Sequence, residues 1–220
     1  MIFVGSYPFS WYTLKILLKN KLIPKIIITI KGDNKGDFIF YKNCLRCSDL
    51  KNTRIILIKD KSDFMKLELE TSQFLVTSAF PILIPNKILS KAKCLALNVH
   101  PSLLPRWRGP DPIRNAIISG DKYIGVSIHK MTDFFDKGEI IAQKKLKNDG
   151  HTNLSEYIKL LAEAGAQLIL NVINNPKIIS NRNDSNYESL YISEPYAHNL
   201  KNKLSLIKEK MPKEYFRITR

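Results

Sequence analysis

The sequence has few cysteines and no long hydrophobic run. Three cysteines occur among its 220 residues, and this odd number favours free thiols in a reducing cytoplasm over a disulfide-stabilised secreted protein. No apolar run approaches the roughly 20 residues that a membrane-spanning helix requires. Residues 1–5 lack a basic leader followed by a long apolar segment, so they predict a first strand and not a signal peptide. We therefore expect a cytoplasmic protein without a membrane partner.

Two patterns that would indicate a bound cofactor are also missing. Gly5-Ser6-Tyr7-Pro8 follows the first strand but does not form the G-x-G-x-x-G fingerprint of dinucleotide-binding folds. Cys44 and Cys47 have the spacing of metal ligands, yet a structural zinc site needs about four ligands and no second pair stands nearby. A redox-active pair is expected at a strand-to-helix junction, whereas this one follows the polar Lys42-Asn43. We expect no metal.

Positive charge exceeds negative charge by a wide margin. The formal net charge is +15, with 35 Lys and Arg against 20 Asp and Glu. One explanation is an anionic partner, and the other is coding bias, since Lys, Ile and Asn are all abundant. We favour coding bias, with room for a diphosphate-bearing substrate. The apolar content of 44% is sufficient for a packed core, and the length corresponds to one domain with a modest extension.

Apolar segments alternate with helical patterns, which predicts an α/β fold with a Rossmann-like, mostly parallel sheet. Ser10 is a suitable N-cap for a helix that ends near Asn20, Asp111-Pro112 opens a second helix, and Asn153 with Glu156 resembles a capping box that starts a third. Strands are expected over residues 2–4, 26–30, 37–41, 54–58, 74–79, 94–99, 123–131 and 139–146, and a further helix over 62–70. We assign residues 1–180 to this domain and 181–220 to a C-terminal extension with a hairpin over 187–195 and a basic tail.

Polar side chains stand at the end of one buried strand. Asn98 and His100 close the apolar run 94–99 and point to the same side, because strand side chains alternate, and ligands of open α/β sheets bind at such strand ends. The Asn98 carboxamide can donate to an anionic oxygen. The His100 imidazole can move a proton, and Asp136 can orient that imidazole and raise its pKa. These groups suit attack of an amine on a carbonyl; the alternative is a hydrogen-bonded structural pair and an ordinary turn aspartate.

The surrounding motif resembles that of a known family. Asn98-Val-His-Pro-Ser-Leu-Leu-Pro105 is followed in order by Arg108-Gly109, by Gly125-Val-Ser-Ile-His-Lys-Met131 and by Asp136-Lys-Gly-Glu-Ile-Ile141. This series resembles the signature of folate-dependent formyltransferases, which include glycinamide ribonucleotide, methionyl-tRNA and nucleotide-sugar enzymes. A match in several parts is more specific than a single short motif. The resemblance covers residues 75–143 closely and 1–174 more loosely, and it implies that Asn98, His100 and Asp136 are catalytic.

The resemblance also implies binding residues on both sides of this trio. It implies N10-formyltetrahydrofolate as co-substrate, with the pterin held between the apolar segment 80–85 and the loop 132–136. The residues expected around the pterin are Ile82, Leu83, Ile84, Met131, Asp133 and Phe135. The residues expected to border the acceptor are Ser102, Arg106, Trp107 and Arg108. Without the downstream motif, segment 80–85 would be interpreted as a core loop between two prolines. We expect His129 to be a packing residue and not a second catalytic histidine.

The acceptor is the part of the resemblance that leaves most alternatives open. The loop after the first strand lacks the Gly- and Ser/Thr-rich phosphate-binding sequence of the glycinamide ribonucleotide enzymes. The roughly 45 residues after Pro176 are too few for the C-terminal barrel of the methionyl-tRNA enzymes. We therefore expect a nucleotide-linked amino sugar for surface polysaccharides such as lipopolysaccharide O-antigen, no nucleic-acid partner, and room for a homodimer. The alternatives are a shortened methionyl-tRNA formyltransferase, a formyltetrahydrofolate hydrolase and, from another class, a basic nucleic-acid-binding module.

Overall fold

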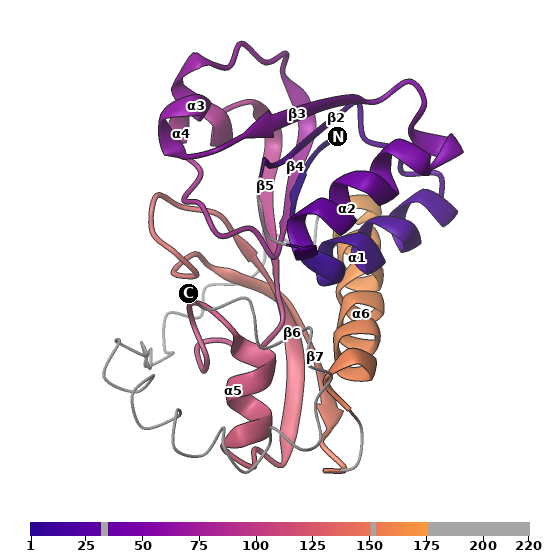
Figure 1. The fold of residues 1–220 in the computed structure, drawn as a ribbon. Helices are drawn as coiled ribbons and strands as arrows, with labels where there is room; N and C mark the ends of the chain where they lie inside the picture. Colours follow the sequence, from indigo (N-terminus) through magenta and orange to yellow (C-terminus); the bar gives the residue numbers. More distant parts are fainter. Residues whose placement is uncertain (32–34, 151–152, 176–220) are drawn as a thin grey trace.

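The computed structural model describes residues 1–31, 35–150 and 153–175. Its strands form one seven-stranded sheet in the order β3-β2-β1-β4-β5-β6-β7 (Figure 1). The strands are β1 (Ile2–Gly5), β2 (Ile26–Ile30), β3 (Arg54–Ile58), β4 (Ser72–Ser78), β5 (Ala92–His100), β6 (Tyr123–Lys130) and β7 (Ile140–Lys147). The first five strands pair in parallel, whereas β6 and β7 run antiparallel to their neighbours. The predicted α/β class with a mostly parallel sheet is confirmed.

Helices cover both faces of this sheet. Figure 1 shows α1 (Tyr7–Lys19), α2 (Lys35–Arg46) and α6 (Leu154–Asn174) on one side, and α3 (Lys61–Lys66) and α4 (Asn86–Leu89) on the other. A short 3-10 helix spans Ser48–Leu50, and α5 (Pro112–Ile118) contacts β6 and α6. The predicted start of α6 is confirmed, since the Asn153 side chain accepts a hydrogen bond from the Glu156 N–H at 3.0 Å. Gly165 brings α6 against β5, because a Cβ there would lie 2.5 Å from Val99 Cγ1.

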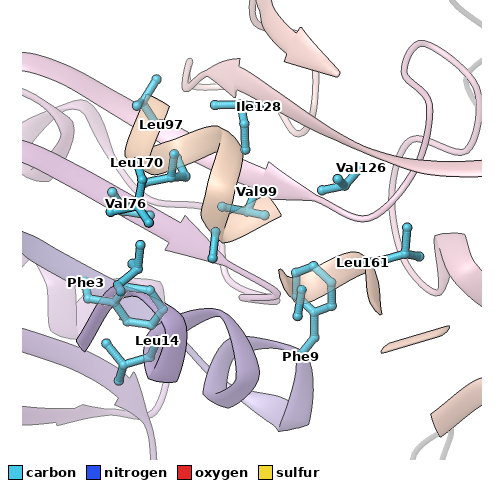
Figure 2. Packing of buried hydrophobic residues seen from close by; sticks show 14 of the residues in the cluster. Phe3, Phe9, Leu14, Val76, Leu97, Val99, Val126, Ile128, Leu161 and Leu170 are labelled. Carbon is cyan, nitrogen blue, oxygen red and sulfur yellow. The ribbon is translucent and has the colours of Figure 1, made fainter. Parts of the chain in front are cut away.

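The hydrophobic core divides into two clusters because strand side chains alternate between the faces of the sheet. Phe3 faces the larger cluster with α1 and α6, whereas its neighbours Ile2 and Val4 face the smaller one with α3 and α4. Figure 2 shows Phe3, Leu14 and Val76 packed together in the larger cluster. Burying each such side chain contributes about 1.5–3 kcal/mol. This packing on both faces holds the carboxyl ends of β1, β4 and β5 along one edge of the sheet.

One segment predicted as a strand is a helix. Residues 37–41 belong to α2, which continues to Arg46. Phe40 and Cys44 lie four residues apart on its buried face, and the Phe40 ring stacks with Phe3 at a centroid distance of 6.3 Å. A short apolar run does not distinguish strand from helix, and here packing against Phe3 favours the helix. Burial raises the pKa of the Cys44 thiol to about 12, consistent with a packing role for the Cys44–Cys47 pair.

Two predicted helix boundaries are also wrong. The first helix begins at Tyr7 with Ser6 at its N-cap position, so Ser10 lies inside the helix and not at its start. The Ser10 hydroxyl bonds to the carbonyl oxygens of Ser6 and Ser78, which ties α1 to the end of β4. The helix predicted over 62–70 ends at Lys66, and its N-cap is Asp60, which accepts from the Ser62 N–H at 2.7 Å. The first helix therefore starts earlier than predicted, and α3 ends earlier than predicted.

The C-terminal extension predicted over 181–220, with its hairpin and basic tail, lies outside the described residues, so its boundary stays a prediction. Within the described part of the chain, every helix is too short or too polar to cross a membrane.

Candidate active site

The carboxyl end of β5 meets the loop that joins β6 to β7. Asn98 and His100 lie two residues apart on β5, and Asp136 comes from the loop. Asp136 Oδ1 is 3.2 Å from Asn98 Nδ2 and 3.4 Å from His100 Nδ1. His100 is only 5% exposed and Asp136 only 8% exposed. The structure therefore brings the three predicted residues together around one buried carboxylate oxygen.

The loop reaches this position through a close backbone approach at Gly138. A Cβ at Gly138 would lie 1.7 Å from the carbonyl oxygen of Lys130, so only glycine fits there. Asp136 has φ of +49°, a left-handed conformation that is uncommon for residues other than glycine. Its Oδ2 accepts a hydrogen bond of 2.9 Å from the Gly109 N–H. Contacts on both carboxylate oxygens thus hold a strained backbone position at the site.

A second histidine completes the cluster. His129 on β6 stands opposite Asn98 in the antiparallel pairing of β5 with β6. Its Nε2 lies 3.0 Å from Asn98 Nδ2 and 3.3 Å from Asp136 Oδ1, and the residue is 2% exposed. The interpretation of His129 as a packing residue alone missed this contact with two of the three predicted catalytic side chains. The alternating pattern of β6 predicts which face of the sheet His129 lies on. The sequence does not reveal the register of β6 against β5, which sets His129 opposite Asn98.

Backbone carbonyls determine which nitrogen of each imidazole carries a proton. His100 Nε2 donates to the Trp107 carbonyl oxygen at 2.8 Å, and His129 Nδ1 donates to the Lys130 carbonyl oxygen at 2.8 Å. In the neutral state, each ring therefore turns an unprotonated nitrogen toward Asp136 Oδ1. A proton taken up by His100 Nδ1 would immediately face the carboxylate. This arrangement suits a base that receives a proton and stabilises it by an ion pair.

Burial and charge act on this pair in opposite directions. Burial lowers the pKa of His100, and the opposing attraction of the Asp136 charge does not fully compensate. Burial also acts to raise the pKa of Asp136, but the neighbouring His100, the contact with the His129 imidazole at 3.3 Å and the Gly109 N–H outweigh it and hold that pKa well below its ordinary range. The sequence predicted that Asp136 raises the pKa of His100. Asp136 does act in that direction, but burial has the larger effect and the net shift is downward. Near neutral pH, His100 is a neutral base beside a charged carboxylate.

These shifts predict that the folded protein loses stability in acid. The folded-state pKa of His100 lies below its ordinary value of 6.5, so the unfolded chain binds the extra proton and the free energy of unfolding falls as the pH drops below 6.5. Asp136 adds a second loss once the pH falls below its ordinary value of 3.8. Chemical denaturation at a series of pH values measures this slope. His100→Gln should flatten the curve between pH 6.5 and 3.8, and parallel curves for the variant and the unmodified protein would contradict the assignment.

The loop 102–109 closes over His100 and uses three of the predicted acceptor residues for internal contacts. Arg106 binds Asp121 through two bonds of 2.8 and 2.7 Å, and the Trp107 indole donates to the same carboxylate at 2.6 Å. The Ser102 hydroxyl donates to the Arg106 carbonyl oxygen at 2.7 Å. These contacts hold the Trp107 carbonyl against His100. Ser102, Arg106 and Trp107 therefore position the loop, whereas Arg108 lies beside the trio with its side chain in no such contact.

The predicted donor-binding residues are not all brought together. Ile84 is buried in the smaller core cluster, and Ile82 and Met131 pack against it. A groove of about 360 Å³ runs beside them and is lined by Leu89, Ala96 and Met131 among others. Leu83 is half-buried, whereas Asp133 and Phe135 lie on the exposed surface of the loop. In the described residues, no group of three His, Cys, Asp or Glu side chains could hold a metal ion.

Residues 58–173 match the family model described as formyl transferase. The chain is 30% identical over 198 residues to a methionyl-tRNA formyltransferase of Ehrlichia canis, covering 85% of this chain and 65% of that protein. It is 38% identical over 128 residues to a methionyl-tRNA formyltransferase of Staphylococcus epidermidis, covering 58% of this chain and 41% of that protein. The chain thus spans about two thirds or less of the length of these relatives.

Solved structures share the fold over most of the chain. A 4-N formyltransferase from Francisella tularensis superposes with a TM-score of 0.65 at 25% identity, over 91% of this chain and 78% of that one. WlaRD, a sugar 3N-formyltransferase solved in the presence of dTDP and 5-N-formyl-THF, superposes with a TM-score of 0.62 at 20% identity, over 89% and 69%. A phosphoribosylglycinamide formyltransferase from Streptococcus pneumoniae has a TM-score of 0.60 at 16% identity, over 80% and 98%.

Proposed function

Because the chain belongs to the formyl transferase family, we propose that it transfers a formyl group from N10-formyltetrahydrofolate to a primary amine. Asn98, His100 and Asp136 carry this reaction in the proposal. The observation that carries it is the convergence of three side-chain nitrogens, from Asn98, His100 and His129, on Asp136 Oδ1 at 3.2–3.4 Å. A buried carboxylate with two imidazoles and a carboxamide supplies both a proton acceptor and an anion-stabilising donor. The chemistry needs no metal and no serine or cysteine nucleophile.

The geometry of Asn98 supports a role for its amide in stabilising the oxyanion. Its Nδ2 lies 3.0 Å from His129 Nε2 and 3.2 Å from Asp136 Oδ1, and these two acceptors are themselves 3.3 Å apart. The triangle is nearly equilateral, so the two acceptors subtend roughly 60° at the nitrogen, about half the separation of the two amide N–H bonds. One N–H can therefore point between both acceptors. The other N–H is then available to the formyl oxygen as it becomes anionic.

The lowered pKa of His100 supports this residue as the group that accepts the proton of the attacking amine. The amine attacks the formyl carbon, the carbonyl oxygen becomes anionic beside Asn98, and the ammonium proton must leave before the intermediate collapses. His100 is neutral and presents its Nδ1 lone pair toward Asp136, so it can accept that proton. The negative charge of Asp136 then stabilises the imidazolium. The same proton can be returned to N10 of the departing tetrahydrofolate, which closes the reaction. His129 acts here by orienting Asn98 and Asp136.

For the acceptor, we propose a nucleotide-linked amino sugar that serves surface polysaccharide synthesis. The support is the fold that the chain shares with WlaRD, a sugar 3N-formyltransferase solved in the presence of dTDP, together with the missing Gly-rich phosphate loop after β1. The second candidate is methionyl-tRNA, supported by the 30–38% identity to methionyl-tRNA formyltransferases. Both acceptors present a primary amine close to phosphate groups, so the trio alone does not distinguish between them.

Formyl transfer to a panel of acceptors tests the proposal. We expect purified protein with N10-formyltetrahydrofolate to formylate at least one nucleotide amino sugar, seen as a mass increase of the sugar and as release of tetrahydrofolate. The amine nucleophile is required, so the same nucleotide sugar with a hydroxyl in place of the amine should give no product. Formylation of charged initiator tRNA with no turnover of any amino sugar would replace the first acceptor with the second. Release of tetrahydrofolate without any formylated acceptor would indicate a hydrolase and contradict both.

A further inference from the structure

One cation beside the trio is held in place by its backbone, and its side chain has no hydrogen-bond or ion-pair partner among the residues that the structure describes. Arg108 lies between Trp107, whose carbonyl accepts from His100, and Gly109, whose N–H donates to Asp136. Trp107 and Gly109 both have positive φ, at +62° and +84°. The backbone on each side of Arg108 is therefore attached to one of the two central site residues. These two flanking hydrogen bonds fix the position of the Arg108 Cα relative to His100 and Asp136.

The neighbouring arginines show by contrast what Arg108 lacks. Arg106 is paired with Asp121 through two hydrogen bonds, and Arg114 pairs with Asp111 at 3.4 Å. No hydrogen bond or ion pair joins the Arg108 side chain to any other residue in the described ranges. The Nε atoms of Arg108 and Arg114 are both buried without a hydrogen bond, but Arg114 keeps its ion pair with Asp111. Arg108 is half-buried, and leaving its buried Nε–H without a hydrogen bond is unfavourable. An anion supplied by a ligand would satisfy it.

We propose that Arg108 binds a phosphate group of the acceptor and thereby places the acceptor amine against His100. The inference rests on the proposed formyl transfer and adds to it the recognition of an anion. A guanidinium fits a phosphate because its planar fork donates two parallel hydrogen bonds. A phosphate held beside His100 leaves the attached amino group within reach of the formyl carbon. Arg108 is a substrate-positioning residue in this role, and it takes no part in the proton transfer.

The position of Arg108 favours the acceptor over the carboxylates of the folate. Trp107, its immediate neighbour, is buried in the larger hydrophobic cluster, whereas Ile84 and Met131 of the proposed donor side belong to the smaller one. The two substrates must approach the trio from different sides for one to attack the other. The loop that carries Arg108 thus borders the acceptor side.

Binding of inorganic pyrophosphate and steady-state kinetics together test this role. The variants are Arg108→Gln, which removes the charge, Arg108→Lys, which keeps it without the fork, and Arg46→Gln as a control for net charge on the exposed end of α2. Loss of a charge-assisted contact should weaken calorimetric pyrophosphate binding by about 10–100-fold in Arg108→Gln. The KM for the acceptor should rise by a similar factor, with a smaller change in kcat and none in the KM for folate. Arg108→Lys should recover part of the loss, and Arg46→Gln should behave as the unmodified protein.

The outcomes separate this inference from the proposed function. Undiminished pyrophosphate binding by Arg108→Gln, no pyrophosphate binding by the unmodified protein, or a rise in the KM for folate in place of the acceptor would each overturn the role of Arg108. Those results would leave formyl transfer intact if turnover persists. Conversely, Arg108→Gln could lose pyrophosphate binding while the unmodified protein formylates no acceptor. That result would support the anion site and contradict the proposed reaction.

Discussion

Replacing His100 with alanine is expected to lower turnover by about 10²–10⁴, the usual contribution of general acid–base catalysis. The neutral imidazole is the group placed to accept the ammonium proton, since its Nε2–H is held by the Trp107 carbonyl and its Nδ1 faces Asp136. Without it, the intermediate must lose its proton to water in a buried site. The measurement is kcat with the best acceptor of the panel, determined by release of tetrahydrofolate.

Folate binding separates this loss from a general failure of the site. His100 does not belong to the smaller core cluster that contains Ile84 and against which Met131 packs, so the affinity for a stable folate analogue should change much less than turnover. The same variant should keep a cooperative unfolding transition. A His100→Ala protein that is folded, binds the folate analogue and retains near-normal turnover would show that another group moves the proton.

Replacing Asn98 with alanine is expected to cost about 10²–10³ in turnover, as measured for the loss of one oxyanion donor elsewhere. The amide N–H that is not shared between His129 and Asp136 is the one placed for the formyl oxygen. The loss should appear in kcat, because this donor acts mainly on charge that develops in the transition state. Asn98→Asp is a more specific test than Asn98→Ala, because it keeps the size of the side chain and replaces the amide donor with an anion.

The control for Asn98 is an asparagine whose side chain makes no contact with the site. Asn20 at the end of α1 bonds only to the backbone of its own helix at 2.8 Å, so Asn20→Ala should retain full turnover. A loss in Asn98→Ala no larger than about tenfold would be too small for an oxyanion donor. In that case the amide would be assigned to holding His129 and Asp136 in place.

The double variants test whether the trio acts as one unit. In the proposed mechanism Asp136 orients His100 and stabilises its protonated form, so the effects of removing either residue should overlap. Residues that act together are non-additive, and the double variant should be little slower than the slower single variant. Multiplication of the two losses would instead indicate that Asp136 acts independently of His100.

Much of this site could be predicted because its signals are local. The two-residue spacing of Asn98 and His100 places them on one face of any strand, and the apolar run before them identifies the strand. The boundaries of β2 and β3 agree with the predicted segments 26–30 and 54–58 for the same reason. The ordered motif from Asn98 to Ile141 indicates the family without any information on geometry. These features depend on residues that are near neighbours in the chain.

Tertiary structure decided the features that depend on residues distant in sequence. Residues 37–41 are helical because Phe40 packs against Phe3, and His129 joins the site because the antiparallel register of β5 and β6 sets it opposite Asn98. Burial, which no spacing reveals, makes His100 a neutral base in spite of the neighbouring carboxylate. The pairing of Arg106 with Asp121 engages that arginine within the loop 102–109, whereas the Arg108 side chain has no ion pair in the described residues. Local periodicity specifies the face on which a side chain lies, but only long-range packing specifies which residues it contacts.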